Sequence, residues 1–145
     1  MDTRPIAPSV APNLGHRDAH AAIRRLTDVL GFEVAALFEE PDGAVAHAQL
    51  VWGTGAINIA SREEAPPRLP ETGPIAVALT ADDADAVDRY YDRALAAGAE
   101  VLLPVEDTFT SNHRFTVQNS EGNRWNVGIP WIDSEAARRL PRRVK

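Results

Sequence analysis

The sequence predicts an α+β fold built from two successive βαβββ modules. A helical segment occurs twice in the 145-residue chain, and strand-like runs surround each copy in the same order. Equivalent positions keep a constant offset of 67 residues, which relates Gly31 to Gly98 and Gly55 to Gly122. The alternative is an ordinary α+β domain whose halves are alike by chance, and the constant offset disfavours it. The length fits one domain.

Each predicted helix has a start signal and a stop signal. The first begins at Asp18, a favourable N-cap, and ends at Gly31, which suits the left-handed conformation that closes many helices. The second has Asp85 as a cap or first-turn acid and ends at Gly98. Apolar residues recur at helical spacing, namely Ala19, Ile23, Leu26 and Leu30 in the first helix and Val87, Tyr91, Ala94 and Leu95 in the second.

Strand-like runs define the rest of each module. One run precedes each helix and three follow it, at 10–15, 32–40, 44–52 and 56–61 in the first half and at 74–80, 99–106, 113–119 and 124–130 in the second. A proline-rich segment at 62–73 is typical of a linker. We therefore expect module one at about 9–62, module two at about 74–132 and a basic tail at 133–145.

Composition excludes several classes of function. The formal net charge of −6 argues against nucleic-acid binding, which draws on clustered Lys and Arg. The absence of cysteine excludes disulfides, thiolate metal sites and a cysteine nucleophile. No apolar run approaches the roughly 20 residues of a membrane span, so no membrane partner is expected. The N-terminal segment lacks the apolar core of a signal peptide, and we expect a cytoplasmic location.

Four segments carry a resemblance to a known family. They read "LGHRDAHAAIRRLTDVLGFEV", "HAQLVWGTGAINIAS", "VDRYYDRALAAGAEVLLPVEDTF" and "FTVQNSEGNRWNVG". In this order and spacing they resemble the vicinal oxygen chelate superfamily of glyoxalases, bleomycin resistance proteins and extradiol dioxygenases, and especially its PhnB-like branch. The resemblance covers about Ser9 to Trp131. It departs from the family pattern where Asn119-Ser120 replaces Asp-Pro.

The resemblance implies two modules whose mixed sheets curl around a cavity that holds a small-molecule ligand. It also implies a homodimer. The enzymes of the superfamily bind a divalent metal through one position on the first strand and one on the third or fourth strand of each module. Carried over, these positions fall on Ala11, Gln49, Pro74 and Asn126. Ala and Pro cannot ligate, and neutral amides are weak donors, so we expect no metal cofactor.

Alternation of side chains along a strand predicts which residues face the cavity. His47, Gln49 and Val51 share one face of their strand, and the other face is expected to pack under a helix. Trp52 and Trp125 are expected in the core. Of the four histidines, His47 alone shares the cavity face with Gln49. The predicted ligand-binding residues are His47, Gln49, Val51, Ile57, Ile59, Thr116, Arg124 and Asn126.

Two classes of function remain. The first is a metal-free binding protein that sequesters a drug or metabolite in the cavity. The alternative is a related lyase, isomerase or oxygenase, which would need a displaced metal site or His47 as a catalytic acid–base, a role that suits the ordinary pKa of histidine. A weaker third hypothesis is a partner-binding subunit with a vestigial cavity.

Overall fold

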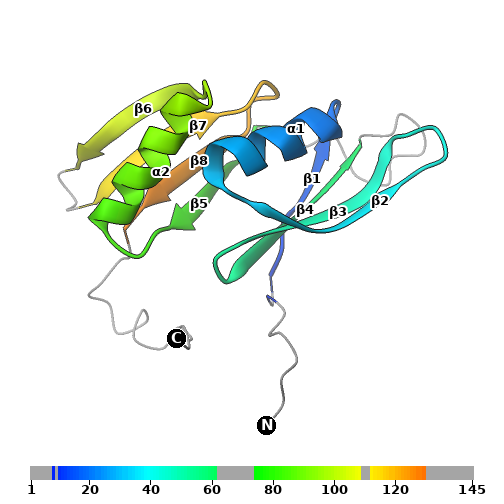
Figure 1. Ribbon diagram of the computed structural model, residues 1–145, viewed down its shortest axis with the longest axis horizontal. Coiled ribbons are helices and arrows are strands. Elements are labelled where there is room, and N and C mark those ends of the chain that lie inside the picture. The colour runs from blue at the N-terminus through cyan, green and yellow to red at the C-terminus, as the bar shows by residue number, and fades with distance from the viewer. Residues whose placement is uncertain (1–7, 9, 62–73, 109–111, 130–145) are drawn as a thin grey trace, which may run out of the picture. The chain divides into compact units, whose positions relative to one another are not determined.

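The computed structural model describes residue 8 and residues 10–61, 74–108 and 112–129. The chain divides into two compact units, Met1–Thr27 with Phe32–Thr72 and Asp28–Gly31 with Gly73–Lys145. Each unit contains one four-stranded mixed sheet (Figure 1). The expected linker at 62–73, the tail at 133–145 and Trp131 lie outside the described residues.

The first sheet has the strand order β1-β4-β3-β2. Strands β1 and β4 run parallel, and the other pairs are antiparallel. Helix α1 contacts β1, β3 and β4. The elements are β1 (Asn13–His16), α1 (Ala19–Arg25), the π-helical continuation η1 (Leu26–Leu30), β2 (Glu33–Glu39), β3 (Val45–Trp52) and β4 (Gly55–Ser61).

The second sheet repeats this order as β5-β8-β7-β6, with β5 parallel to β8. Helix α2 contacts β6, β7 and β8. The elements are β5 (Ala76–Thr80), α2 (Ala84–Ala96), β6 (Glu100–Asp107), β7 (His113–Gln118) and β8 (Arg124–Gly128). The predicted α+β class and the two βαβββ modules are therefore confirmed.

The helices begin and end at residues with the expected chemistry. The Asp18 carboxylate accepts a hydrogen bond from the Ala21 N–H at 3.0 Å and is the N-cap of α1, as predicted. The N-cap of the second helix is Asp83, whose carboxylate accepts from the Ala86 N–H at 2.8 Å, so of the two roles expected for Asp85 the first-turn acid is correct. Asp85 lies in the first turn. Gly31 and Gly98 follow the helices with φ of 76° and 74°, a conformation that glycine adopts without steric cost.

One face of each sheet packs under its helix and forms the core. Trp125 is 1% exposed and Phe115 is fully buried, and the Tyr91 ring of α2 lies 5.2 Å from the Phe115 ring. The core position predicted for Trp125 is thus confirmed. Leu95 is 50% exposed, so the apolar stripe of α2 is narrower than its spacing predicted. The other face of each sheet, which its helix does not cover, is called the open face below.

The sequence repeat is not free of gaps. Gln49 on β3 and Thr116 on β7, 67 positions apart, pair with Asn58 and Asn126, which are 68 apart. The second hairpin has a longer turn, because Gln118 pairs with Arg124 whereas Trp52 pairs directly with Gly55. The expectation of an unbroken offset through the last hairpin is therefore wrong. Equivalent site positions must be read from strand pairing.

No helix in the described part of the chain is long and apolar enough to cross a membrane.

Candidate ligand-binding site

The open face of the first sheet carries the predicted residues of β3. Gln49 pairs with Asn58, Val51 with Ala56 and His47 with Phe38. Residues paired across strands project from the same face. His47, Gln49 and Val51 therefore share the open face.

The structure contradicts the expected face of Ile57 and Ile59. They pair with Leu50 and Ala48 and are 3% and 0% exposed, so they belong to the core under α1. Alternation along one strand divides its residues between two faces, but it does not show which of these faces is continuous with a given face of the neighbouring strand. The register between strands decides it, and a shift of one residue reverses the face.

Three carboxamide side chains lie in one row across the first sheet. Asn13 on β1 pairs with Asn58 on β4, and Asn58 pairs with Gln49 on β3. We call Asn13, Asn58 and Gln49 the carboxamide row. The Asn58 Nδ2 donates to the Asn13 Oδ1 at 2.8 Å. The Asn58 Oδ1 is buried and has no hydrogen-bond partner among the described residues. An unmet buried acceptor costs roughly 1–3 kcal/mol.

The equivalent row of the second sheet is Ala78, Asn126 and Thr116. Thr116 is 4% exposed, and its hydroxyl donates to the Asn126 Oδ1 at 2.8 Å. The acceptor that is unmet at Asn58 is therefore satisfied at Asn126. The row differs from the carboxamide row because two of its three side chains carry no amide.

Two arginines flank this second row. The Arg114 guanidinium donates to the Glu106 carboxylate at 2.6 Å and to the Pro104 carbonyl at 3.3 Å. Exposed Arg124 donates only a long 3.4 Å bond to the Gln118 side chain among the described residues. Arg124 is thus the arginine of this pair whose charge remains available to a ligand.

The donor set does not fit a divalent metal. Ala11 and Pro74 precede β1 and β5, and the open-face residues beside Asn58 and Asn126 on those strands are Asn13 and Ala78. The open-face positions of these strands therefore hold three neutral amides and a methyl group, and the predicted position Gln49, which pairs with Asn58, is a neutral amide as well. Within residues 10–61, 74–108 and 112–129 no group of three or more His, Cys, Asp or Glu side chains could hold a metal ion. Zinc and iron sites draw on imidazole, thiolate and carboxylate.

The other histidines do not rebuild such a site. His16 is fully buried, and it has the same strand parity as core residue Leu14. His20 contacts the Gly43 carbonyl at 2.9 Å. Exposed His47 stacks against the Phe38 ring, with 6.2 Å between ring centroids. His47 is therefore the one histidine of the first sheet on its open face.

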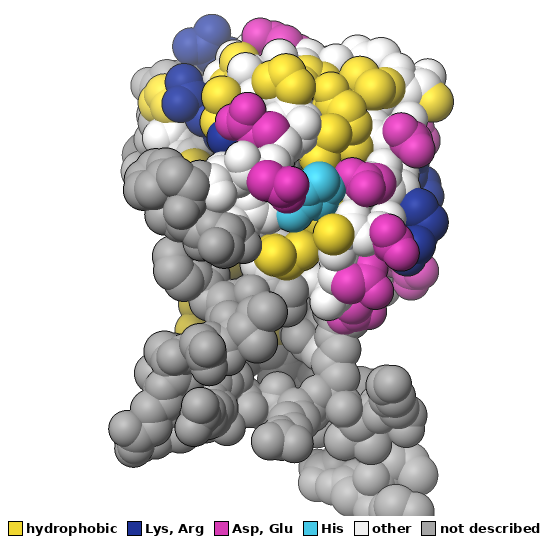
Figure 2. All heavy atoms as spheres, turned by 90° about the vertical axis from the view of Figure 1, so that its left-hand side faces the viewer, with side chains coloured by type: hydrophobic (Ala, Val, Ile, Leu, Met, Phe, Trp, Pro, Cys, Tyr) yellow, Lys and Arg dark blue, Asp and Glu magenta, His cyan; other side chains and the backbone are white. Residues whose placement is uncertain are grey.

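Sequence reasoning missed a cluster around His113. Its Nδ1 lies 2.8 Å from the Asp107 carboxylate and its Nε2 lies 2.7 Å from the Asp88 carboxylate. Figure 2 shows a histidine among acidic side chains on the face of this unit. Carboxylates only accept hydrogen bonds, so both contacts are satisfied when the ring is the charged imidazolium and both of its nitrogens donate. The hydrogen bonds to Asp88 and then Asp107 raise the pKa of His113 above its ordinary value of 6.5.

Known proteins share this architecture. Residues 10–127 match the family model of the Glyoxalase/Bleomycin resistance protein/Dioxygenase superfamily. An uncharacterized protein of Mycobacterium bovis is 27% identical over 133 residues, which cover 86% of this chain and 85% of that protein.

Two solved structures show the same fold. TioX from Micromonospora sp. ML1 has a TM-score of 0.69 and 25% identity, covering 84% of this chain and 98% of that chain. A lactoylglutathione lyase from Agrobacterium tumefaciens has a TM-score of 0.62 and 22% identity, covering 84% and 94%. With a family model that spans most of its length, the chain belongs to the glyoxalase/bleomycin resistance protein/dioxygenase superfamily.

Proposed function

We propose that the protein binds a small organic molecule without a metal ion and sequesters it unchanged. The observation that carries the proposal is the set of open-face side chains on the parallel strand pair of each sheet, β1 with β4 and β5 with β8. Asn13 and Asn58 on one pair, and Asn126 on the other, offer amide hydrogen bonds, and Ala78 offers none, so no strong metal ligand is present among these four side chains. Neutral amides suit the recognition of a polar organic group.

On each open face, binding would rest on apolar contact or on oriented hydrogen bonds. Val51 supplies apolar surface on the open face of the first sheet, beside Gln49 and His47. Asn126, Thr116 and Arg124 supply hydrogen bonds on the open face of the second. A few placed polar groups beside apolar surface orient small molecules in their binding sites. A drug or a metabolite is the ligand class that the family membership favours.

A metal-independent enzyme that uses His47 is the second candidate. His47 lies on the open face, where it could exchange a proton with a ligand. Among the described residues, however, it contacts the Phe38 ring and no carboxylate orients it. A catalytic histidine is usually held in place by such a group. The geometry therefore favours binding.

Elemental analysis combined with a ligand screen tests the proposal. Protein purified without chelator should contain no stoichiometric transition metal. A ligand present at 100 times its Kd should raise the free energy of unfolding by about 2.7 kcal/mol. Mass spectrometry should recover that ligand unchanged. One equivalent of bound metal, or turnover that His47→Ala abolishes, would establish an enzyme instead.

The proposal also covers the oligomeric state, the cellular location and the branch of the superfamily. We propose a homodimer, supported by the exposed apolar side chains of Val34, Leu37 and Phe38 on the edge strand β2. Light scattering coupled to gel filtration measures the mass directly. A cytoplasmic location is also part of this proposal. Membership of the PhnB-like branch rests on the segment from Phe115 to Gly128.

A further inference from the structure

The carboxamide row has hydrogen-bonding capacity that the protein leaves unused. Each carboxamide offers two N–H donors and an oxygen with two lone pairs. Of the three side chains, only the Asn58 Nδ2 and the Asn13 Oδ1 are joined, at 2.8 Å. The Gln49 side chain makes no hydrogen bond to any described residue, and the Asn58 Oδ1 is without a partner within the same ranges. Donors and acceptors therefore lie side by side on two neighbouring strands.

The spacing of the row suits a single ligand group. Asn58 and Gln49 are directly paired on β4 and β3, and neighbouring strands lie roughly 4.8 Å apart. An amide group that spans this gap donates its N–H to one side chain and accepts an N–H from the other. The Asn58 Oδ1 is covered although the residue is only partly buried, so a ligand reaches it when a neighbouring side chain such as Gln49 changes its rotamer while Asn58 keeps its bond to Asn13.

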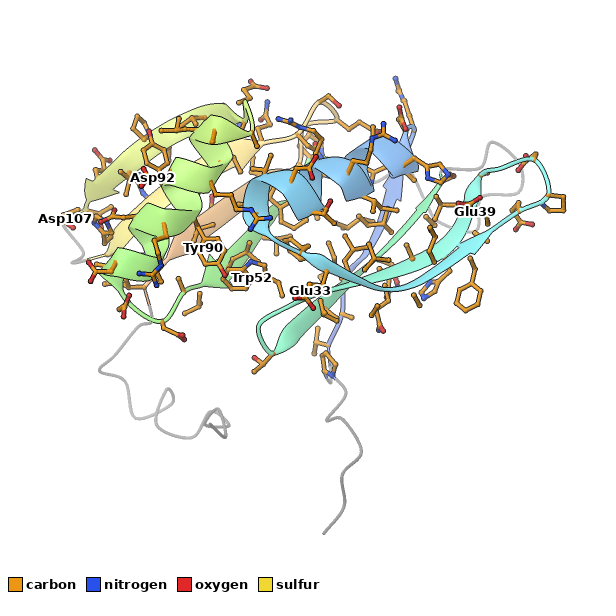
Figure 3. All side chains as sticks on the ribbon, in the orientation of Figure 1. Glu33, Glu39, Trp52, Tyr90, Asp92 and Asp107 are labelled. Atoms are coloured by element: carbon orange, nitrogen blue, oxygen red, sulfur yellow. The ribbon has the colours of Figure 1, made fainter. Side chains whose placement is uncertain are left out.

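The row also lacks charge. On β2 the residue in line with the row is Ala36, which pairs with Gln49. Ionisable side chains occur at the next open-face positions on either side of the row. Glu33 (labelled in Figure 3) pairs with Val51 on one side, and His47 pairs with Phe38 on the other. A charged ligand group needs a counter-charge when it leaves water. The row itself supplies none.

We infer that the carboxamide row recognises a neutral ligand group that carries both an N–H donor and a carbonyl acceptor, such as a primary amide, a lactam or a cyclic imide. The inference rests on the proposed function and names the ligand chemistry of the first sheet. Gln49 and Asn58 make the paired hydrogen bonds, and Asn13 holds the Asn58 amide in orientation through the 2.8 Å bond.

An NMR titration with benzamide, benzoate and benzamidine tests the inference. These probes share a ring and differ in the charge and hydrogen bonding of one group. Benzamide should bind at least about tenfold more tightly than benzoate and should shift the side-chain amide signals of Asn58 and Gln49. Equal binding of benzoate, unchanged amide signals, or no benzamide binding at millimolar concentration would overturn the inference. Metal content and turnover, measured separately, decide the proposed function.

Variants separate recognition from folding. Asn58→Leu should weaken benzamide binding about tenfold, whereas Gln118→Leu, which removes a carboxamide from the other sheet, should leave it unchanged. Asn58→Asp keeps the shape and replaces the Nδ2 donor by an acceptor. It should reverse the order so that benzamidine binds more tightly than benzamide. Equal losses in Asn58→Leu and Gln118→Leu, or an unreversed order in Asn58→Asp, would contradict the inference.

Discussion

The open faces of the two sheets use the same strand order for opposite hydrogen-bond arrangements. In the second sheet Thr116 donates to Asn126 and satisfies its oxygen. In the first, the residue equivalent to Thr116 is Gln49, which makes no such bond among the described residues, and the Asn58 Oδ1 remains unmet. The duplicated scaffold thus satisfies the side-chain oxygen of Asn126 in one sheet and leaves the equivalent oxygen of Asn58 unmet in the other.

The core faces differ in the size of the side chain at equivalent positions. Trp125 on β8 pairs with Val117, and its equivalent on β4 is Ile57, which pairs with Leu50. Both are nearly fully buried, with 1% and 3% exposure. The second unit therefore depends on one large aromatic side chain where the first uses a smaller aliphatic one.

The largest expected effect is the loss of this aromatic side chain. Trp125→Ala should lower the free energy of unfolding by about 3–5 kcal/mol, because it removes buried surface and leaves a cavity. Ile57→Ala is the matched change in the first unit and should cost about 2–4 kcal/mol. Chemical denaturation measures both. A Trp125→Ala cost below that of Ile57→Ala would show that the second core collapses around the gap.

Smaller effects of different sign are expected on the open faces. Thr116→Val keeps the shape but removes the donor to Asn126, and should cost about 1 kcal/mol of stability. Asn58→Leu removes an unmet acceptor and should leave the ligand-free protein unchanged or about 1 kcal/mol more stable. Thermal unfolding of the two variants without ligand checks the contrast. An equal loss in both would mean that the 2.8 Å bond from Asn58 to Asn13 contributes more stability than the unmet oxygen costs.

The fold could be predicted because its signals are local. Helical spacing, the Asp18 cap and the glycines at 31 and 98 each act within a few residues. The replacement of the family's Asp by Asn119 also keeps a local role, because the Asn119 Oδ1 accepts the N–H groups of Glu121 and Asn123 at 3.0 and 2.9 Å. An amide oxygen closes this turn as a carboxylate would.

The site was harder to predict because it depends on register. The N-cap of the second helix was also hard to predict, because Asp82, Asp83 and Asp85 are all possible caps. The structure uses Asp83. The faces of Ile57 and Ile59 follow from pairing with β3, which no single strand encodes. His113 meets Asp88 from 25 residues away and Asp107 from 6 residues away, on two different elements. Neither partner could be identified from the sequence around His113.

The smallest expected effect concerns the His113 cluster, which the first unit lacks because the equivalent residue on β3 is Ala46. The pKa of His113 is raised by Asp88 and Asp107, so the charged form is stabilised in the folded state. This contribution is fully present below the unfolded pKa of about 6.5 and is lost as pH rises through the folded pKa. The two carboxylate side chains are 52% and 87% exposed, which limits the contribution to about 0.3–1 kcal/mol.

Carboxylate variants resolve this contribution. Asp88→Asn should lower the pKa of His113, which NMR of its ring protons measures as a function of pH. It should also remove most of the stability that the wild-type protein loses as the pH rises. Asp92→Asn makes the same charge change one turn further along α2 (Figure 3), where no contact with His113 is described, and should leave the pKa nearly unchanged. Equal shifts in both variants would mean that His113 senses the acidic helix as a whole. A pKa shift in Asp88→Asn and none in Asp92→Asn would show that the 2.7 Å contact with Asp88 raises the pKa of His113. The stability lost as the pH rises would then come from the second unit.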